Sequence, residues 1–262
     1  MECLNALGRE YIDGAEKVRL AKAAGFNTID VDLIFGIANQ GEDVLRKGFL
    51  MAFELGATQV STYPFIDFSY ANNIRKPLGK QEKKRLLNCL EKTSVEIGCD
   101  RTAVWTFAKK GTSRYSSITR DAFIGFGPSA ISLTKEFLKL NTFSVEEYIK
   151  CVNKGKIPTA MTMKFSERNR ALYWLFWNAY TLKFNDDEFK KLFGVNLEKM
   201  FKTELRIGIA LRLLTKVENS YILTKKGTYF YHLLEQKYTN RYIDKSWREA
   251  RENPWPNEIR LY

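Results

Sequence analysis

The first third of the chain alternates between helix-like and strand-like spacing of its hydrophobic residues. Residues 15–24 repeat apolar positions at helical intervals, and Gly25 ends this segment, as a glycine after the last helical turn commonly does. A strand is predicted over 28–35, and its run 31–35 is nearly continuous in apolar residues, as expected for a strand buried on both faces. A second helix is predicted after Gly41, with an apolar stripe of Val44, Leu45, Phe49 and Ala52. A strand over 58–65 follows, so the pattern predicts an α/β fold with parallel strands covered by helices.

The middle of the chain continues this pattern less regularly. A helix is predicted from about Lys80 to Ile97, and a strand over 102–110. A Gly- and Ser-rich loop around a short strand follows, and helix is expected again near Leu133. The composition changes near residue 145. We therefore expect two domains, of residues 1–145 and 146–262.

The last hundred residues favour helix. Helices are predicted over 168–182, 186–193 and 197–214, and Glu218 and Asn219 form a candidate hairpin turn between two short strands. Three helices with a two-stranded wing are typical of a small winged-helix-like α+β domain.

Composition narrows the classes of function only a little. The net charge is +12 and the pI is near 9.4, but the basic residues are spread along the chain, which favours a solvated basic surface over a nucleic-acid patch. No apolar run is long enough to span a bilayer, so we expect a cytoplasmic protein without a membrane partner. Cys3, Cys89, Cys99 and Cys151 show no C-x-x-C spacing, and we expect no metal site.

Two acids interrupt the first predicted strand. Asp30 and Asp32 are two residues apart and therefore point to the same face of an ideal strand. A carboxylate on a buried strand costs free energy unless it is paired or hydrogen-bonded. Asp32 lies near the carboxyl end of the strand, where parallel-sheet folds gather their ligands. It is either a ligand-binding acid or a satisfied acid that caps a loop or meets Arg or Lys.

Four segments share their order and spacing with a known family. They read "LNALGREY", "DVDLIFGIANQ", "VSTYPF" and "DAFIGFGPSAIS". In these segments the chain resembles the oxygen-independent coproporphyrinogen III oxidase family of radical S-adenosylmethionine (SAM) enzymes. The resemblance covers most of the chain. It implies the C-terminal half of a radical SAM β/α barrel, followed by the winged-helix-like domain.

The resemblance also implies site residues. Arg9 matches an arginine near the SAM carboxylate or ribose, and Asp32 matches the acid that meets the ribose hydroxyls. Gly36 and Gln40 match the loop after that strand, and small residues of the glycine loop let the backbone approach the ligand. For the apolar and glycine positions a core or tight-turn role is an equal alternative. These positions are Ile66, Gly125, Gly127, Ser129 and Ile131.

The chain also departs from the family. The defining C-x-x-x-C-x-x-C segment, whose thiolates hold a [4Fe-4S] cluster, does not occur in these residues. We therefore expect no cluster on this chain and no reductive cleavage of SAM by it alone. We also expect either a truncation or a partner chain that supplies the missing half of the barrel.

The function stays open at this point. Within the family the choices are oxidative decarboxylation of a porphyrinogen, SAM-dependent methyl transfer and haem handling, with a tetrapyrrole as a small-molecule substrate. A cluster-free protein that binds SAM, haem or a partner is the first alternative. The second is a nucleic-acid-binding module, disfavoured because the helix over 197–214 is very apolar. His232 is expected to be a packed histidine rather than a haem ligand.

Overall fold

The computed structural model describes residues 11–113 and 120–257. They divide into two compact units, one of residues 11–67 and 73–113 and one of residues 68–72 and 120–257. The domain boundary expected between residues 145 and 146 stays a prediction. None of the helices in the described ranges combines the length and the apolar composition that crossing a bilayer requires.

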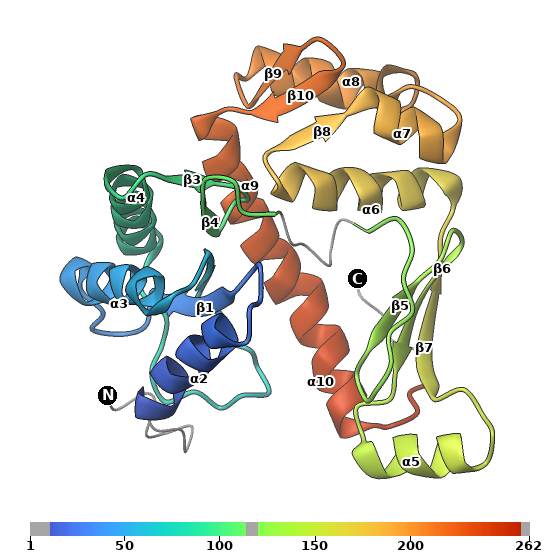
Figure 1. Ribbon diagram of the computed structural model, residues 1–262. Helices are drawn as coiled ribbons and strands as arrows, with labels where there is room; N and C mark the ends of the chain where they lie inside the picture. The colour runs from blue at the N-terminus through green and yellow to red at the C-terminus, as the bar shows by residue number, and fades with distance from the viewer. Residues whose placement is uncertain (1–10, 114–119, 258–262) are drawn as a thin grey trace. The chain divides into compact units, whose positions relative to one another are not determined.

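The first unit is a four-stranded mixed sheet with helices (Figure 1). Strands β1 and β2 are parallel, whereas β4 is antiparallel to both β2 and β3, so the strand order is β1-β2-β4-β3. The elements in chain order are α2 (Tyr11–Ala23), β1 (Asp30–Phe35), α3 (Glu42–Leu55), β2 (Gln59–Pro64), α4 (Lys80–Glu96), β3 (Cys99–Arg101) and β4 (Thr106–Lys109).

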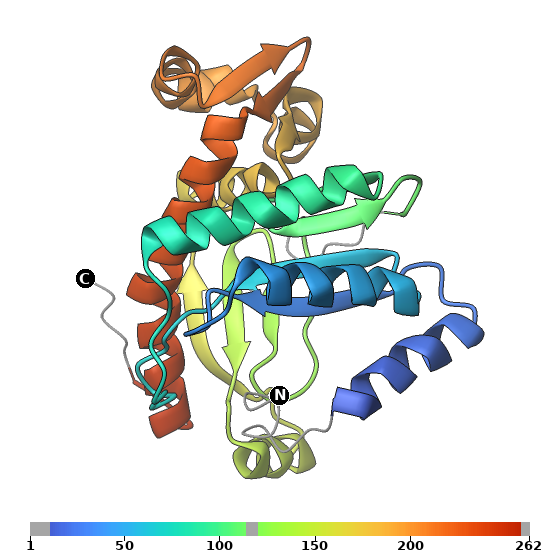
Figure 2. The same cartoon turned by 90° about the vertical axis from the view of Figure 1, so that its left-hand side faces the viewer.

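Helices α3 and α4 cover one face of this sheet (Figure 2). Leu45, Phe49 and Ala52 of α3 repeat at helical spacing and are buried. The ring of Phe49 meets Phe107 of β4 edge to face, with the ring centroids 5.5 Å apart. Gly56 ends α3 at a φ of +121°, a conformation that an L-residue adopts only with strain. The predicted parallel α/β pattern is therefore confirmed for β1 and β2.

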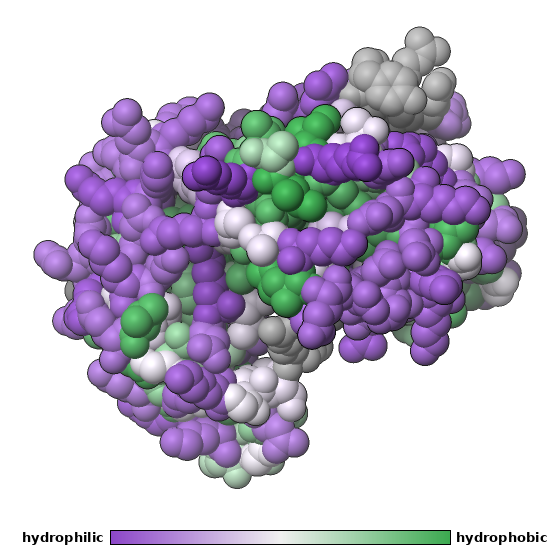
Figure 3. All heavy atoms as spheres, turned by 90° about the horizontal axis from the view of Figure 1, so that it is seen from above, coloured by the Kyte–Doolittle hydropathy of each residue, from purple (hydrophilic) through white to green (hydrophobic). Residues whose placement is uncertain are grey.

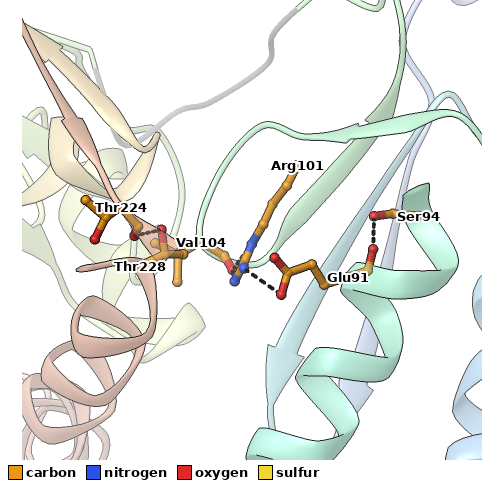
Figure 4. A network of polar contacts seen from close by, with 6 residues as sticks. All are labelled: Glu91, Ser94, Arg101, Val104, Thr224 and Thr228. Atoms are coloured by element: carbon orange, nitrogen blue, oxygen red, sulfur yellow. Dashed lines mark hydrogen bonds and ion pairs between the residues drawn. The ribbon is translucent and has the colours of Figure 1, made fainter. Parts of the chain in front are cut away.

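A polar contact fixes the β3–β4 hairpin to α4 (Figure 4). The Arg101 guanidinium donates to the carbonyl oxygen of Val104 and lies 4.0 Å from the carboxylate of Glu91 on α4. The carbonyl of Glu91 in turn accepts a 2.8 Å hydrogen bond from Ser94. The hairpin turn is thus tied to the helix that covers the sheet.

Two expectations for this unit are wrong. The first strand is not buried on both faces: Asp30, Asp32 and Ile34 are exposed, because they lie on the face that α3 and α4 do not cover. Val44 is 67% exposed, since it lies beside the buried stripe of α3 rather than on it. The strand expected over 102–110 is confirmed as β4, but it runs antiparallel to β2.

The second unit contains two antiparallel three-stranded sheets, of order β5-β6-β7 and β8-β10-β9. The elements of the first sheet and its helix are β5 (Ile131–Leu133), β6 (Phe137–Asn141), α5 (Val145–Asn153) and β7 (Thr159–Lys164). The remaining elements are α6 (Glu167–Tyr180), β8 (Lys183–Asn185), α7 (Asp186–Phe193), α8 (Leu197–Ala210), β9 (Leu214–Val217), β10 (Ser220–Leu223), α9 (Lys225–Tyr238), a π-helix η1 (Thr239–Ile243) and α10 (Asp244–Glu252).

The helix expected near Leu133 is wrong, because the chain there forms the β5–β6 hairpin. The backbone of Thr134 donates to the carbonyl of Phe137, and the Phe137 amide donates back to the Thr134 hydroxyl. These bonds close the turn, and β6 then pairs along its length with β7. The apolar residues of this segment fit helical spacing as well, so the pairing with β7 decides the outcome.

The C-terminal helices follow the sequence prediction, but the expected two-stranded wing has a third strand, because β8 pairs with β10. Helix α7 has the predicted bounds, and the expected hairpin turn falls between β9 and β10, where Glu218 adopts a φ of 51°. Trp174, Phe189 and Tyr221 belong to one buried cluster shared by these helices and the β8-β10-β9 sheet. His232 is buried, stacks on Tyr229 and lies 3.0 Å from the Gln236 amide, so it is a packed histidine, as expected.

Candidate functional site

The face of the first sheet that points away from α3 and α4 carries a row of polar side chains. Alternation along β1 places Asp30 and Asp32 on this face, and the strand register sets them opposite Gln59 and Ser61 of β2. Ser61 in turn pairs with Thr106 of β4. The result is a polar strip across three strands, which we define as Asp30, Asp32, Gln59, Ser61 and Thr106.

Asp30 is held by its neighbours in this polar strip. Its Oδ2 accepts a 2.6 Å hydrogen bond from Gln59 Nε2 and a 2.9 Å bond from the Ser61 hydroxyl. The Ser61 and Thr106 hydroxyl oxygens are 3.2 Å apart, and because Ser61 donates to Asp30, Thr106 is the donor to Ser61. Gln59, Ser61 and Thr106 are buried. Asp30 is thus the satisfied acid of the pair.

Asp32 differs from Asp30. No side chain or amide in the described ranges donates a hydrogen bond to its carboxylate, and its side chain is exposed. The protein around it still removes part of its hydration, and this loss, with the charge of Asp30 as the second cause, raises the pKa of Asp32. The expected shared face of the two acids is confirmed. Asp32 is therefore an available acceptor, three residues before the end of β1.

The loop after β1 is closed by Gln40. Its Oε1 accepts a 2.7 Å hydrogen bond from the Gly36 amide, and its Nε2 donates to the Ile34 carbonyl at 3.1 Å. Gly36 has a φ of +82°, and a Cβ there would lie 2.9 Å from Cγ of Lys83. Lys83 is buried, and its ammonium donates to the carbonyl of Phe65 at the end of β2. Gly36 and Gln40 therefore shape the end of the strand beside Asp32.

The glycine loop of the second unit is equally well defined. The Gly125 amide donates to the Ser132 hydroxyl, and the Gly127 amide donates to the hydroxyl of Tyr148, both at 3.0 Å. The buried amide of Asn141 donates to the Gly127 carbonyl at 3.0 Å. A Cβ on Gly125 would overlap the carbonyl of Ile131. Close packing inside the loop is therefore a sufficient reason for glycine at position 125.

The predicted site residues are divided between the two units. Asp32, Gly36, Gln40 and Ile66 belong to the first unit, where Ile66 is half-buried just after β2. The other predicted residues within the described ranges belong to the second unit, and Arg9 lies outside the described residues. Those in the second unit are Gly125, Gly127, Ser129 and Ile131, with Ile131 half-buried at the start of β5.

The described thiols are not arranged as ligands. Cys89 and Cys99 are buried, and burial raises the pKa of both thiols, which disfavours the thiolate that a cluster needs. No three His, Cys, Asp or Glu side chains in the described ranges come close enough to hold a metal ion. These residues do not fit an iron–sulfur cluster.

Sequence reasoning missed four residues that build the site. Gln59 and Ser61 repeat the two-residue spacing of Asp30 and Asp32, so alternation in "TQVSTYPF" could have placed them on one face. Thr106 and Lys83 could not be found in this way. Their positions depend on the antiparallel register of β4 and on the packing of α4 over Gly36.

Two curated proteins and one solved structure resemble parts of this chain. No protein-family model matches it. It is 22% identical over 177 residues to the oxygen-independent coproporphyrinogen III oxidase of Cereibacter sphaeroides strain ATCC 17025, covering 59% of this chain and 39% of that protein. A second C. sphaeroides protein, anaerobic coproporphyrinogen III oxidase 1, is 21% identical over the same coverage. The chain thus spans about two fifths of the length of these curated relatives.

A solved structure shows the same fold. It is the coproporphyrinogen III oxidase HemN from Escherichia coli, described as a radical SAM enzyme, with a TM-score of 0.69 at 14% identity. The match covers 90% of this chain and 61% of HemN. The resemblance predicted from the sequence is therefore confirmed: over part of their length, the chain is similar in sequence and fold to the oxygen-independent coproporphyrinogen III oxidases.

Proposed function

We propose that this chain binds SAM, as the C-terminal part of an enzyme that resembles oxygen-independent coproporphyrinogen III oxidase. The observation that carries the proposal is the Asp32 carboxylate, which no described group engages, near the carboxyl end of a parallel strand. Asp32 would accept hydrogen bonds from the two ribose hydroxyls of SAM. An ionised carboxylate offers several acceptor positions and suits a pair of neighbouring hydroxyls.

The other predicted site residues have supporting parts in this proposal. Gly36 and Gln40 fix the backbone beside Asp32, and Ile66 offers apolar surface to the adenine. The SAM-binding roles expected of Gly125, Gly127 and Ile131 stay predictions within the second unit, and Arg9 would pair with the carboxylate of SAM. The first unit is then the C-terminal part of a β/α barrel, and the C-terminal helices with the β8-β10-β9 sheet are its winged-helix-like appendage.

The function proposed for this chain is SAM binding and does not include SAM cleavage. Reductive cleavage of SAM needs an electron from a thiolate-held cluster, and the thiols in the described ranges do not fit one. The cluster and the remaining strands would come from a further segment or a partner chain. β1 is the open edge of the described sheet, with exposed Asp32 and Ile34, and suits pairing with such a strand. The named relatives act on coproporphyrinogen III, so a tetrapyrrole is the proposed substrate class.

Calorimetric titration with SAM tests the proposal. Asp32→Asn keeps the size of the side chain but removes the charge, and we expect SAM to bind it about tenfold more weakly or worse, because a hydrogen bond to a charged group is lost. Asp43→Asn is the matched control, since it removes the same charge from the first turn of α3. Absence of SAM binding to the unmodified chain, or equal binding by Asp32→Asn, would contradict the proposal.

A further inference from the structure

The exposed side of helix α8 in the second unit carries an apolar stripe beside a basic stripe. Its backbone departs from helical geometry at Phe201, so the regular helix runs from Lys202 to Ala210. Leu205 and Gly208 are buried, and Leu214 of β9 packs against Gly208. The side of the helix away from these residues faces solvent.

One stripe of that side is apolar. Ile207 is 53% exposed and Leu211, the residue that caps the helix, is 52% exposed. They are four residues apart and therefore neighbours on one side of the helix. Figure 3, which looks onto α8 and the β9–β10 hairpin, shows apolar residues gathered within a surround of hydrophilic ones. Surface leucines are normal singly, but a paired stripe with a charged border indicates an interaction surface.

The neighbouring stripe is basic. Lys202 and Arg206 are also four residues apart and exposed, and Lys199 extends the stripe before the kink. Lys199 and Lys202 form no ion pair with any described residue. The acids of this helix are already engaged, Glu204 by Arg168 at 2.5 Å and Glu198 by Lys216 at 2.7 Å. Small residues, Thr203 and Ala210, separate the basic stripe from the apolar one at helical spacing.

We propose that α8 binds the surface of an anionic lipid bilayer, with Ile207 and Leu211 at the acyl boundary and Lys199, Lys202 and Arg206 at the headgroups. A bilayer offers negative charge and apolar material at adjacent depths and needs no matching groove. Nucleic acid would satisfy the cations but leave the apolar stripe in water. The sequence led us to expect no membrane partner because no segment spans a bilayer; surface binding needs no such segment.

Vesicle flotation tests this inference and is independent of SAM. The chain is mixed with phosphatidylcholine vesicles that contain, or lack, phosphatidylglycerol. We expect it to float with the anionic vesicles only and to be released as salt increases. Lys202→Ala should weaken partitioning about fivefold, the usual contribution of one basic residue near a charged surface. Leu211→Ser should weaken it about tenfold through the lost apolar contact.

Matched controls show whether the effect is specific to α8 or follows from the loss of any exposed lysine or apolar residue. Lys80→Ala removes an exposed lysine of α4, and Val44→Ser removes an apolar residue that is 67% exposed on α3. Neither should change partitioning, and thermal melting should show all four variants folded. Three outcomes would overturn the inference: no flotation of the unmodified chain, equal loss in the controls, or tight binding to duplex DNA that Leu211→Ser leaves unchanged.

Discussion

Gln59 Nε2 donates a 2.6 Å hydrogen bond to Asp30 Oδ2 across the parallel pair of β1 and β2. This bond, with the one from Ser61, commits one carboxylate of the strand to the sheet and leaves the other, on Asp32, available. Two acids of the same type, two residues apart, therefore have different roles. The difference comes from the neighbouring strand rather than from their own segment.

The Gln59 side chain should stabilise the first unit. Gln59→Ala removes a buried donor, and we expect it to lower the free energy of unfolding by about 1–3 kcal/mol, the usual effect of losing a hydrogen bond to a charged group. Urea denaturation measures the change. Gln59→Glu is the sharper comparison, since it keeps the size but sets a second carboxylate against Asp30. It should cost more than Gln59→Ala, and the reverse order would contradict the described bond.

Gln40 should hold the loop after β1. Gln40→Ala loses both hydrogen bonds, to the Gly36 amide and to the Ile34 carbonyl, and should destabilise by about 1–2 kcal/mol. The loop should also become a faster target for limited proteolysis. Asn39→Ala is the control, because it shortens an exposed polar side chain of the same loop. The φ of Asn39 is +64°, so alanine there costs a small amount of folding free energy of its own. Equal rates of proteolysis for Gln40→Ala and the unmodified chain would contradict the prediction that Gln40 holds this loop.

Two glycines should respond to alanine in opposite ways. At Gly125 a Cβ would overlap the Ile131 carbonyl, so Gly125→Ala should destabilise by about 1–3 kcal/mol. At Gly14, inside α2, a Cβ meets nothing within 4 Å, so Gly14→Ala should stabilise by about 0.5–1 kcal/mol. Thermal melting of both variants gives the signs. A stabilising Gly125→Ala would show that the glycine loop packs differently.

Glu235 should make stability depend on pH. It is buried in α9, its Oε1 accepts from the Thr239 hydroxyl, and no described group bonds its Oε2. Burial, the largest cause, raises its pKa from 4.5 to about 7, against a smaller opposing effect of the Thr239 bond. A carboxyl with a raised folded-state pKa stabilises fully below its unfolded pKa, and that stability is lost as pH rises through about 7.

Glu235→Gln removes this titration. Relative to the unmodified chain, the variant should gain about 3 kcal/mol between pH 4.5 and pH 8, since it stays neutral throughout. Urea denaturation at several pH values measures the difference, with Glu188→Gln in the first turn of α7 as an exposed control. A difference that does not grow with pH would mean that Glu235 is not the buried titrating acid.

Local structure and the resemblance to the coproporphyrinogen III oxidases could be predicted from the sequence alone. Helical spacing placed α3, α4 and the C-terminal helices, and alternation placed Asp30 and Asp32 on one face. These features depend on neighbours within a few residues along the chain, and the periods of helix and strand report them directly.

Which of the two acids is available, and which segments pair as strands, depends on contacts between segments that are far apart in the sequence. The bonds of Asp30 come from Gln59 and Ser61, about thirty residues away, and their geometry depends on the parallel register of β1 and β2. The segment from Leu133 onward became a hairpin because β6 pairs with β5 on one side and with β7 on the other, and β4 runs antiparallel to β2 and forms a hairpin with β3. Contacts between distant segments set these outcomes, and a pattern read along one segment contains no information about its partner.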